Sequence, residues 1–169
     1  MKSRVCQGFT QFLIKRLNSI AHKENSQNIS GIIISLCLSA HCYTGDQEWR
    51  NYQFSAEVKP KLGSNHNIQF RVQGGIRSYA VGLAPNNEMV LYKNENGYRS
   101  LASSSYLWDD QQSYQLTVEA KDNHFIVSVN GDKVLEYIDN DNPYLFGKVG
   151  FSNFNGSHTH YAGVSVKGL

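Results

Sequence analysis

The stretch Trp49-Arg50-Asn51-Tyr52-Gln53-Phe54-Ser55-Ala56-Glu57-Val58 contains an alternation of apolar and polar side chains that begins at Tyr52. From Tyr52 to Val58 every second residue is apolar, and the residues between them are polar. A period of two is typical of a β-strand with one buried face and one solvated face. Because no helical period interrupts the sequence after this stretch, we predict an all-β chain.

Turn-forming residues divide the rest of the sequence at intervals of roughly ten residues, the spacing of an antiparallel sandwich or barrel. Asn130-Gly131 marks the clearest hairpin, because a type I′ turn needs two residues that tolerate positive φ. Between the turns we expect strands at residues 68–72, 78–83, 89–93, 114–119, 125–129, 133–138, 149–151 and 161–166.

Length and composition restrict the kind of protein further. A chain of 169 residues is long enough for one domain with a sizeable core and too short for a second catalytic domain. The net charge is only +2, and no basic run follows Tyr43, so we expect no nucleic-acid partner.

All three cysteines lie in the first quarter of the chain, so the sandwich has no disulfide framework. A bridge between Cys37 and Cys42 is disfavoured, because five residues along one strand place the two side chains on opposite faces.

The first 30 residues differ in character from the rest, and we predict an N-terminal extension over residues 1–30 and the sandwich domain over residues 31–169. Apolar residues at near-helical spacing between Cys6 and His22 indicate a short amphipathic helix. The apolar run at residues 31–40 is too short for a transmembrane helix. It fits either the first buried strand, which we favour, or the h-region of a signal peptide, which would place the protein outside the cytoplasm.

Several segments of the sequence carry a family resemblance: WRNYQFSAEV at residues 49–58, FRV from Phe70, YAVGL from Tyr79, SVNGDKVL from Ser128, then Asp139 and GKVGF from Gly147. In this order they resemble the concanavalin A-like jelly-roll superfamily over residues 43–169. The chain is most similar to its laminin-G-like branch, which includes fructan-binding carbohydrate-binding modules and 3-keto-disaccharide hydrolase-like domains. The resemblance implies an antiparallel two-sheet jelly-roll sandwich and a carbohydrate or glycoside ligand.

The alternation also predicts a polar face that could bind sugar hydroxyls. If the apolar residues of segments 52–58 and 68–72 point into the core, one opposite face carries Gln53, Ser55, Glu57, Gln69, Arg71 and Gln73. Arginine and glutamine offer the donors and acceptors that vicinal hydroxyls need. We expect the ligand contacts at Gln69, Arg71, Gln73, Arg77 and Tyr79, with Trp108 as the stacking surface and Tyr98 as a weaker stacking candidate. The alternatives are a solvated sheet face with Glu57–Arg71 pairing, and a Trp108 that packs on the sandwich.

Two short groups of residues could hold a metal ion. Asp139, Asp141 and the asparagines beside them could chelate a structural calcium ion, but Asx turns before Pro143 explain the same residues, and we favour the turns. His158 and His160 alternate on one strand face, which without a third ligand is more typical of a polar edge. We expect no other cofactor.

The sequence lacks the motifs of a nucleophilic hydrolase and the paired carboxylate signature of jelly-roll glucanases. We therefore predict a non-catalytic carbohydrate-binding module, accessory to a sugar-processing protein and part of a larger protein. A glycoside-processing enzyme of the 3-keto-disaccharide hydrolase type is the first alternative. A protein-interaction or structural sandwich is the second, and it predicts an exposed apolar patch instead of a polar site.

Overall fold

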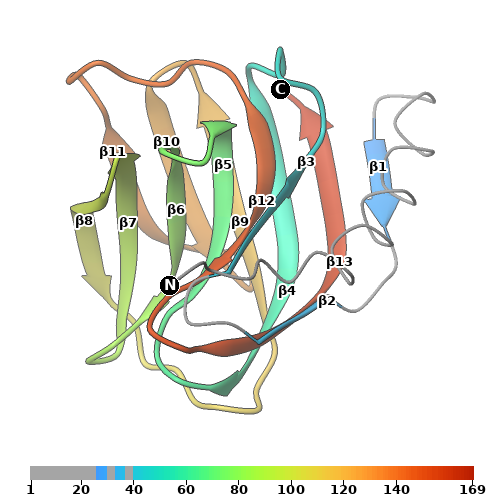
Figure 1. Cartoon of the computed structure of the whole chain (residues 1–169), viewed down its shortest axis with the longest axis vertical. Coiled ribbons are helices and arrows are strands. Elements are labelled where there is room, and N and C mark those ends of the chain that lie inside the picture. Colours follow the sequence, from blue (N-terminus) through green and yellow to red (C-terminus); the bar gives the residue numbers. More distant parts are fainter. Residues whose placement is uncertain (1–25, 30–32, 37–39) are drawn as a thin grey trace, which may run out of the picture.

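The computed structural model describes residues 26–29, 33–36 and 40–169. These residues form thirteen strands and no helix, arranged as two antiparallel sheets that pack face to face (Figure 1). The predicted all-β sandwich is therefore confirmed. In the part of the chain that the structure describes, no helix is long and apolar enough to cross a membrane.

Each sheet is a continuous antiparallel ladder. Sheet A has the order β1 (Ser26–Ile29), β13 (His158–Gly168), β4 (Tyr52–Leu62), β9 (Tyr114–Lys121), β10 (His124–Val129) and β11 (Asp132–Ile138), and β2 (Ile33–Leu36) also pairs with β13. Sheet B has the order β3 (Ala40–Thr44), β12 (Lys148–Asn153), β5 (His66–Gly74), β6 (Arg77–Ala84), β7 (Glu88–Glu95) and β8 (Tyr98–Ser105).

Every strand predicted from the alternation lies within an observed strand. The hairpin between β10 and β11 is also confirmed, since Asn130 and Gly131 have φ values of 53° and 93°. Strand β8 was not predicted, because its serine-rich sequence YRSLASSS has no clear apolar alternation.

The structure describes only part of the N-terminal region. The predicted helix between Cys6 and His22 lies outside the described residues. The apolar run at residues 31–40 is not a single strand, because β2 pairs with β13 in sheet A whereas β3 begins at Ala40 and pairs with β12 in sheet B. Cys42 is a free thiol, and burial raises its pKa to about 11. Cys37, the other cysteine of the disfavoured bridge, lies outside the described residues.

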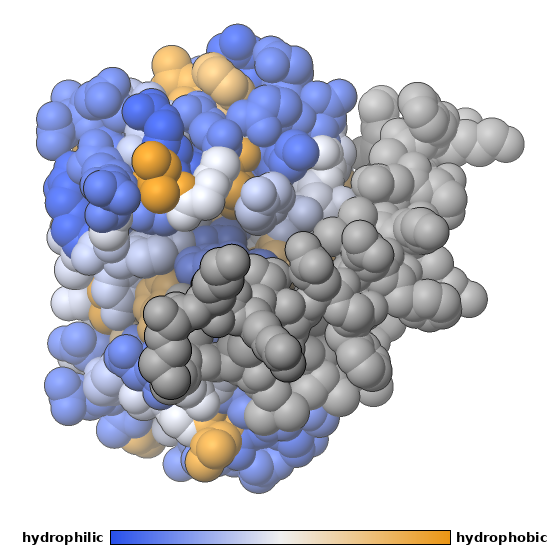
Figure 2. Space-filling view, in the orientation of Figure 1, coloured by the Kyte–Doolittle hydropathy of each residue, from blue (hydrophilic) through white to orange (hydrophobic). Residues whose placement is uncertain are grey.

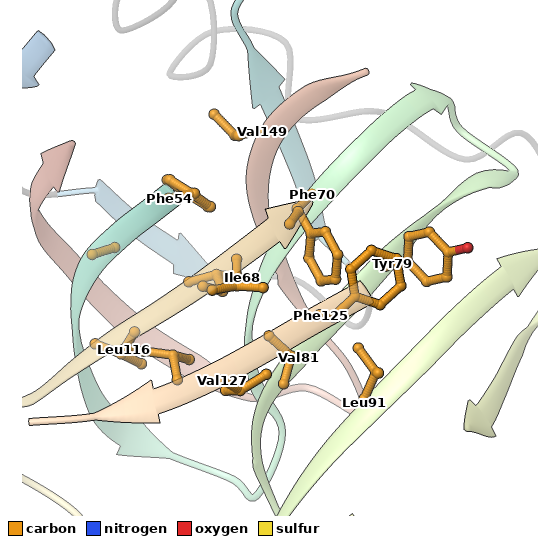
Figure 3. Close-up of a cluster of buried hydrophobic side chains, with 14 of the residues drawn as sticks. Phe54, Ile68, Phe70, Tyr79, Val81, Leu91, Leu116, Phe125, Val127 and Val149 are labelled. Carbon is orange, nitrogen blue, oxygen red and sulfur yellow. The ribbon is translucent and has the colours of Figure 1, made fainter. Parts of the chain in front are cut away.

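A continuous apolar core fills the space between the sheets (Figure 3). Phe54 on β4 and Phe125 on β10 meet Ile68 and Phe70 on β5, and all four side chains are fully buried. Burying a side chain of this size stabilises the fold by roughly 1.5–3 kcal/mol. Because Ile68 and Phe70 face this core, the residues that alternate with them face away from it.

The pairing of strands corrects one prediction about the polar face. Strand β4 belongs to sheet A and β5 to sheet B, so the two do not share an outer face. Gln53 and Glu57 project from one side of the sandwich and Gln69 from the other, and the expected face over both strands is wrong. The Glu57–Arg71 pairing does not form either, because Arg71 bonds other groups.

Two glycines let neighbouring strands of sheet B approach closely. A Cβ atom at Gly82 would lie 2.0 Å from the carbonyl oxygen of His66, and one at Gly150 would lie 2.2 Å from that of Cys42. Such distances exclude any side chain at either position.

The sheet curves so strongly that rings from its two edge strands meet over its outer face: the ring centroids of His41 on β3 and Tyr98 on β8 are 6.0 Å apart.

Candidate functional site

The outer face of sheet B, which faces the reader in Figure 1, carries a group of buried polar side chains. Asn67 and Gln69 alternate on β5 with the core residues, and Ser152 on β12 lies opposite Asn67 in register. All three are at most 2% exposed although they point away from the apolar core. Figure 2 gives the same view, and hydrophilic to intermediate colours prevail over strands β5 to β8 where these are visible.

Several polar atoms of this group have no hydrogen-bond partner among the described residues. They are both amide atoms of Asn67, Oε1 of Gln69 and the hydroxyl of Ser152. Leaving a buried polar group unpaired costs about 1–3 kcal/mol, and folded proteins pair nine in ten or more of such groups. Three side chains with unpaired atoms on two adjacent strands therefore suggest a place where hydroxyls of a ligand bind. We call these three residues the polar floor.

Four aromatic rings gather over the same face, and we call them the aromatic cluster. They are His41 on β3, Tyr92 on β7, Tyr98 on β8 and Phe154 just after β12. Tyr98 and Phe154 are 4.6 Å apart between centroids, and the ring of His41 is parallel to that of Tyr98 to within 1°. The amide nitrogen of Gln69 lies 2.5 Å from the hydroxyl of Tyr98 and 3.2 Å from Nδ1 of His41, which joins the cluster to the polar floor.

The site has little charge. Although the ring of His41 keeps part of its surface exposed, desolvation by its neighbours lowers its pKa below 6.5, against the opposing effect of the Gln69 contact. Burial raises the pKa of Tyr98, so its hydroxyl stays protonated. The strands of sheet B contain two carboxylates, Glu88 and Glu95, and Glu95 is paired with a cation on the core side of β7. A face of this kind suits an uncharged ligand rich in hydroxyls.

Of the residues predicted to contact a ligand, Gln69 lies on this face and Arg71 does not. The side chain of Arg71 is fully buried and donates to backbone carbonyls, including that of Leu145 at 2.5 Å and that of Ala120 at 3.0 Å. Its guanidinium also lies 5.1 Å from the ring centroid of Tyr52. Arg71 therefore ties β5 to β9 and to the segment before β12, which is a structural role.

Gln73 and Arg77 lie together beyond the β-bulge at the end of β5. Nε2 of Gln73 donates to the carbonyl of Phe146, and Nε of Arg77 donates to Oε1 of Gln73 at 3.2 Å. The guanidinium of Arg77 lies 4.5 Å from the ring centroid of Tyr144. Among the described residues neither side chain hydrogen-bonds to the polar floor or to the aromatic cluster, so both stand apart from these two groups.

Tyr79 and Trp108 belong to the packing of the sandwich. Tyr79 is fully buried, and its hydroxyl donates to the Asp139 carboxylate at 2.5 Å. Trp108 donates from its indole nitrogen to the carbonyl of Ala84 and packs edge-on against His66. The alternative expected for Trp108, a loop residue packed on the sandwich, agrees with these contacts.

The oxygen-rich turn at residues 139–142 surrounds a cation that the chain itself supplies. Nζ of Lys93 lies 2.9 Å from the Asp139 carboxylate and donates to the carbonyls of Asp141 and Asn142, the latter at 3.0 Å. Burial alone would raise the pKa of Asp139, but hydrogen bonds from Tyr79 and Lys93 hold it below its usual value. The lysine ammonium thus has the ligands that a calcium ion would need, and calcium binding there stays a prediction.

His158 and His160 lie side by side on β13 of sheet A, with ring centroids 5.1 Å apart. They are in the other sheet from the polar floor. Among the described residues, no group of three or more His, Cys, Asp or Glu side chains could hold a metal ion.

Sequence reasoning missed most of the polar floor and the aromatic cluster. Asn67 could have been found, because it precedes Ile68 in the same alternation that singled out Gln69. Ser152 could not, since only the pairing of β12 with β5 places it opposite Asn67.

Comparison with known families agrees with this architecture. The family model of the 3-keto-alpha-glucoside-1,2-lyase-like domain matches residues 22–167 of the chain. The chain belongs to this family. The predicted resemblance to the concanavalin A-like sandwich superfamily, with its 3-keto-disaccharide hydrolase-like branch, is confirmed. A search of curated proteins found no match.

Solved structures similar to this member of the 3-keto-alpha-glucoside-1,2-lyase-like family include sugar-binding and sugar-processing proteins. The carbohydrate-binding module CBM66 from Bacillus subtilis is similar with a TM-score of 0.64 at 17% identity, over 84% of this chain and 85% of that one. A fructosyltransferase from A. japonicus gives 0.65 at 13% identity, over 89% of this chain and 27% of that one. Galectin LEC-6 from Caenorhabditis elegans gives 0.54 at 12% identity, over 83% and 95%. At these identities the likeness shows a shared fold.

Proposed function

We propose that the protein binds an uncharged carbohydrate on the outer face of sheet B. The observation that carries this proposal is the polar floor, whose buried atoms on Asn67, Gln69 and Ser152 have no partner among the described residues. A saccharide matches this arrangement, because its hydroxyls both donate and accept while the faces of its ring pack on aromatic side chains. The aromatic cluster supplies such rings on the same face and contacts the floor through Gln69.

The names of similar proteins support the same class of ligand. CBM66 is a carbohydrate-binding module, the family is named for a lyase of 3-keto-alpha-glucosides, and LEC-6 is a galectin. All three names point to a saccharide or glycoside as the ligand of this chain. Between a binding module and an enzyme, we favour a module that binds without catalysis. A glycosidase needs two carboxylates about 5–10 Å apart. Sheet B offers Glu88 alone, because Glu95 is paired with Arg99 at 2.9 Å and with Lys93 at 3.6 Å on the core side.

The family name makes a lyase the second candidate. Elimination from a 3-keto-glucoside needs a base to take the proton next to the ketone and an acid to protonate the leaving oxygen. His41, held neutral by its lowered pKa, is a base within the aromatic cluster. An assay that follows the consumption of a 3-keto-α-glucoside decides between binding and turnover.

A glycan array probed with the full chain, with and without calcium, tests the proposed binding. We expect specific binding to neutral saccharides, and a drop in affinity of about tenfold or more in both Asn67→Ala and Ser152→Ala, since tenfold corresponds to about 1.4 kcal/mol. Gln53→Ala on the outer face of sheet A is the matched control and should bind as the wild type does. Absence of binding to every saccharide on the array would refute the proposal, and dependence on calcium would support the metal prediction.

A further inference from the structure

The side chain of Tyr98 reaches across the outer face of sheet B to the polar floor. Tyr98 begins β8, the edge strand, whereas Gln69 lies on β5, with β7 and β6 between them (Figure 1). Its hydroxyl nevertheless lies 2.5 Å from Nε2 of Gln69 and 3.4 Å from the hydroxyl of Ser78 on β6. The ring therefore lies over the sheet and covers the place where we propose that a saccharide binds.

The surroundings of the Tyr98 ring are those that a sugar ring would need. The ring of His41 is parallel to it, with centroids 6.0 Å apart, and Phe154 lies against it at 4.6 Å. Tyr92 meets it edge-on at 6.3 Å. The hydroxyl of Tyr98, like a sugar hydroxyl, both donates and accepts, and it contacts Gln69 of the floor and Ser78 on β6.

One phenol hydroxyl cannot satisfy the whole floor. It offers one donor and two acceptor sites, whereas both amide atoms of Asn67 and Oε1 of Gln69 stay unpaired among the described residues, and the hydroxyl of Ser152 lies near enough to that of Tyr98 to lower its pKa without a hydrogen bond of normal geometry. A saccharide with several hydroxyls could reach more of these atoms. The floor is thus built for more hydrogen bonds than Tyr98 makes with it.

We infer that Tyr98 is an internal stand-in for the saccharide: in the free protein it occupies the ligand's position, and it must swing out before the ligand reaches the floor. This inference rests on the proposed function. It makes Tyr98 a specificity-determining residue, because only a ligand that forms more hydrogen bonds with the floor than the phenol does can displace it. Simple aromatic or apolar molecules could not compete.

The backbone around Tyr98 does not obstruct this movement. It follows the turn at Asn96 and Gly97, which have φ values of 61° and 148°, and it begins an edge strand whose next residues, Arg99 and Ser100, are exposed. Segments with few buried contacts at a sheet edge open with small free energies. Rotation about the side-chain bonds of Tyr98 leaves the pairing of β7 with β8 intact.

Three variants test the inference by calorimetric titration with sucrose, lactose and methyl α-D-glucopyranoside, after the array has identified which of these probes binds. In Tyr98→Ala the stand-in is absent, and we expect affinity to rise on the order of tenfold, because the competing closed state no longer reduces it. Tyr98→Phe removes only the hydroxyl and should give a smaller rise. Tyr137→Ala, a half-buried tyrosine on the edge strand of sheet A, controls for general destabilisation and should leave affinity unchanged.

A second readout follows the movement itself. Nitration of Tyr98 by tetranitromethane, located by mass spectrometry, should become faster when the saccharide is added, whereas a tyrosine that stacks on the ligand would be protected. Weaker binding in a folded Tyr98→Ala, or protection of Tyr98 by the ligand, would overturn the stand-in role while the proposed function survives. If neither the wild type nor Tyr98→Ala binds any array saccharide, the proposed function itself fails.

Discussion

The substitution Asn67→Ala should make the free protein more stable while it weakens saccharide binding. The amide of Asn67 is fully buried, and neither of its polar atoms has a partner among the described residues. An unpaired buried polar group costs about 1–3 kcal/mol, and alanine removes that cost. Part of the gain is offset because the contacts of the deleted atoms are lost. We expect a net increase of up to about 2 kcal/mol in the free energy of unfolding, or roughly 2–4 °C in melting temperature for each kcal/mol.

The matched control is Asn153→Ala, the same change on the adjacent strand but on the core side. Oδ1 of Asn153 accepts a hydrogen bond from the hydroxyl of Tyr161 at 2.7 Å and from that of Thr159 at 2.9 Å. Alanine would leave both buried hydroxyls with one partner fewer. Nδ2 of Asn153 has no partner among the described residues, so its removal offsets part of this cost, and we expect Asn153→Ala to lose up to about 2 kcal/mol of stability.

Urea unfolding followed by tryptophan fluorescence measures both changes, and equal m-values would show that the unfolded states are comparable. The sign of the difference between the two asparagines is the decisive quantity. If Asn67→Ala loses more than about 1 kcal/mol, Asn67 has a stabilising partner in the free protein and the reasoning from unpaired atoms is refuted.

Other predictions concern the buried charges and can be checked by the same unfolding assay. Arg71→Met should cost about 3–5 kcal/mol, because several carbonyls lose their donor, whereas Arg77→Met on the exposed edge should change stability by less than about 1 kcal/mol; equal effects would contradict the structural role of Arg71. Lys93→Met should cost about 3–5 kcal/mol, because it leaves the Asp139 carboxylate buried without its cation, and recovery in the double variant Lys93→Met/Asp139→Asn would identify that charge as the cause. Burial lowers the pKa of His66 below 6.5, so the unfolded chain binds the proton more tightly and stability should fall as the pH drops below 6.5; a His66→Gln variant with the same pH slope would exclude this histidine.

Alternation in the sequence predicts the strands well but assigns the faces less reliably. It gives the side of each residue within one strand, and the apolar sides of β4 and β5 do meet in the core as expected. It cannot tell which sheet a strand joins, so Gln53 and Gln69 were expected on one face and lie on opposite sides of the sandwich. Strand order depends on long-range pairing, which a period of two does not encode.

Local irregularities explain why the site predicted from the sequence and the site proposed from the structure share so few residues. By alternation Arg71 should project outward with Gln69, but Arg71 has a φ of 51° and the pairing of β5 with β6 shifts register between Phe70 and Gly74. This bulge turns the guanidinium into the end of the sandwich. Tyr98 was a weaker candidate than Trp108, because Trp108 lies in a turn-rich stretch and nothing in a serine-rich strand indicates a side chain that reaches past two neighbouring strands.

Buried polar residues in this protein fall into two groups that sequence patterns cannot distinguish. Lys93 and the two terminal nitrogens of Arg71 are buried and surrounded by acceptors, so removing either side chain should destabilise the fold, although Nε of Arg71 has no partner among the described residues. Asn67 and Ser152 are buried with atoms that no described residue satisfies, so they weaken the fold unless a ligand pairs with them. Buried polar atoms without a partner are expected at functional sites, where a protein tolerates lower stability because the same atoms bind a ligand. The two groups differ in whether each polar atom has a partner. For this reason we propose the binding site on the outer face of sheet B, and not at the arginines and the tryptophan that side-chain chemistry alone would favour.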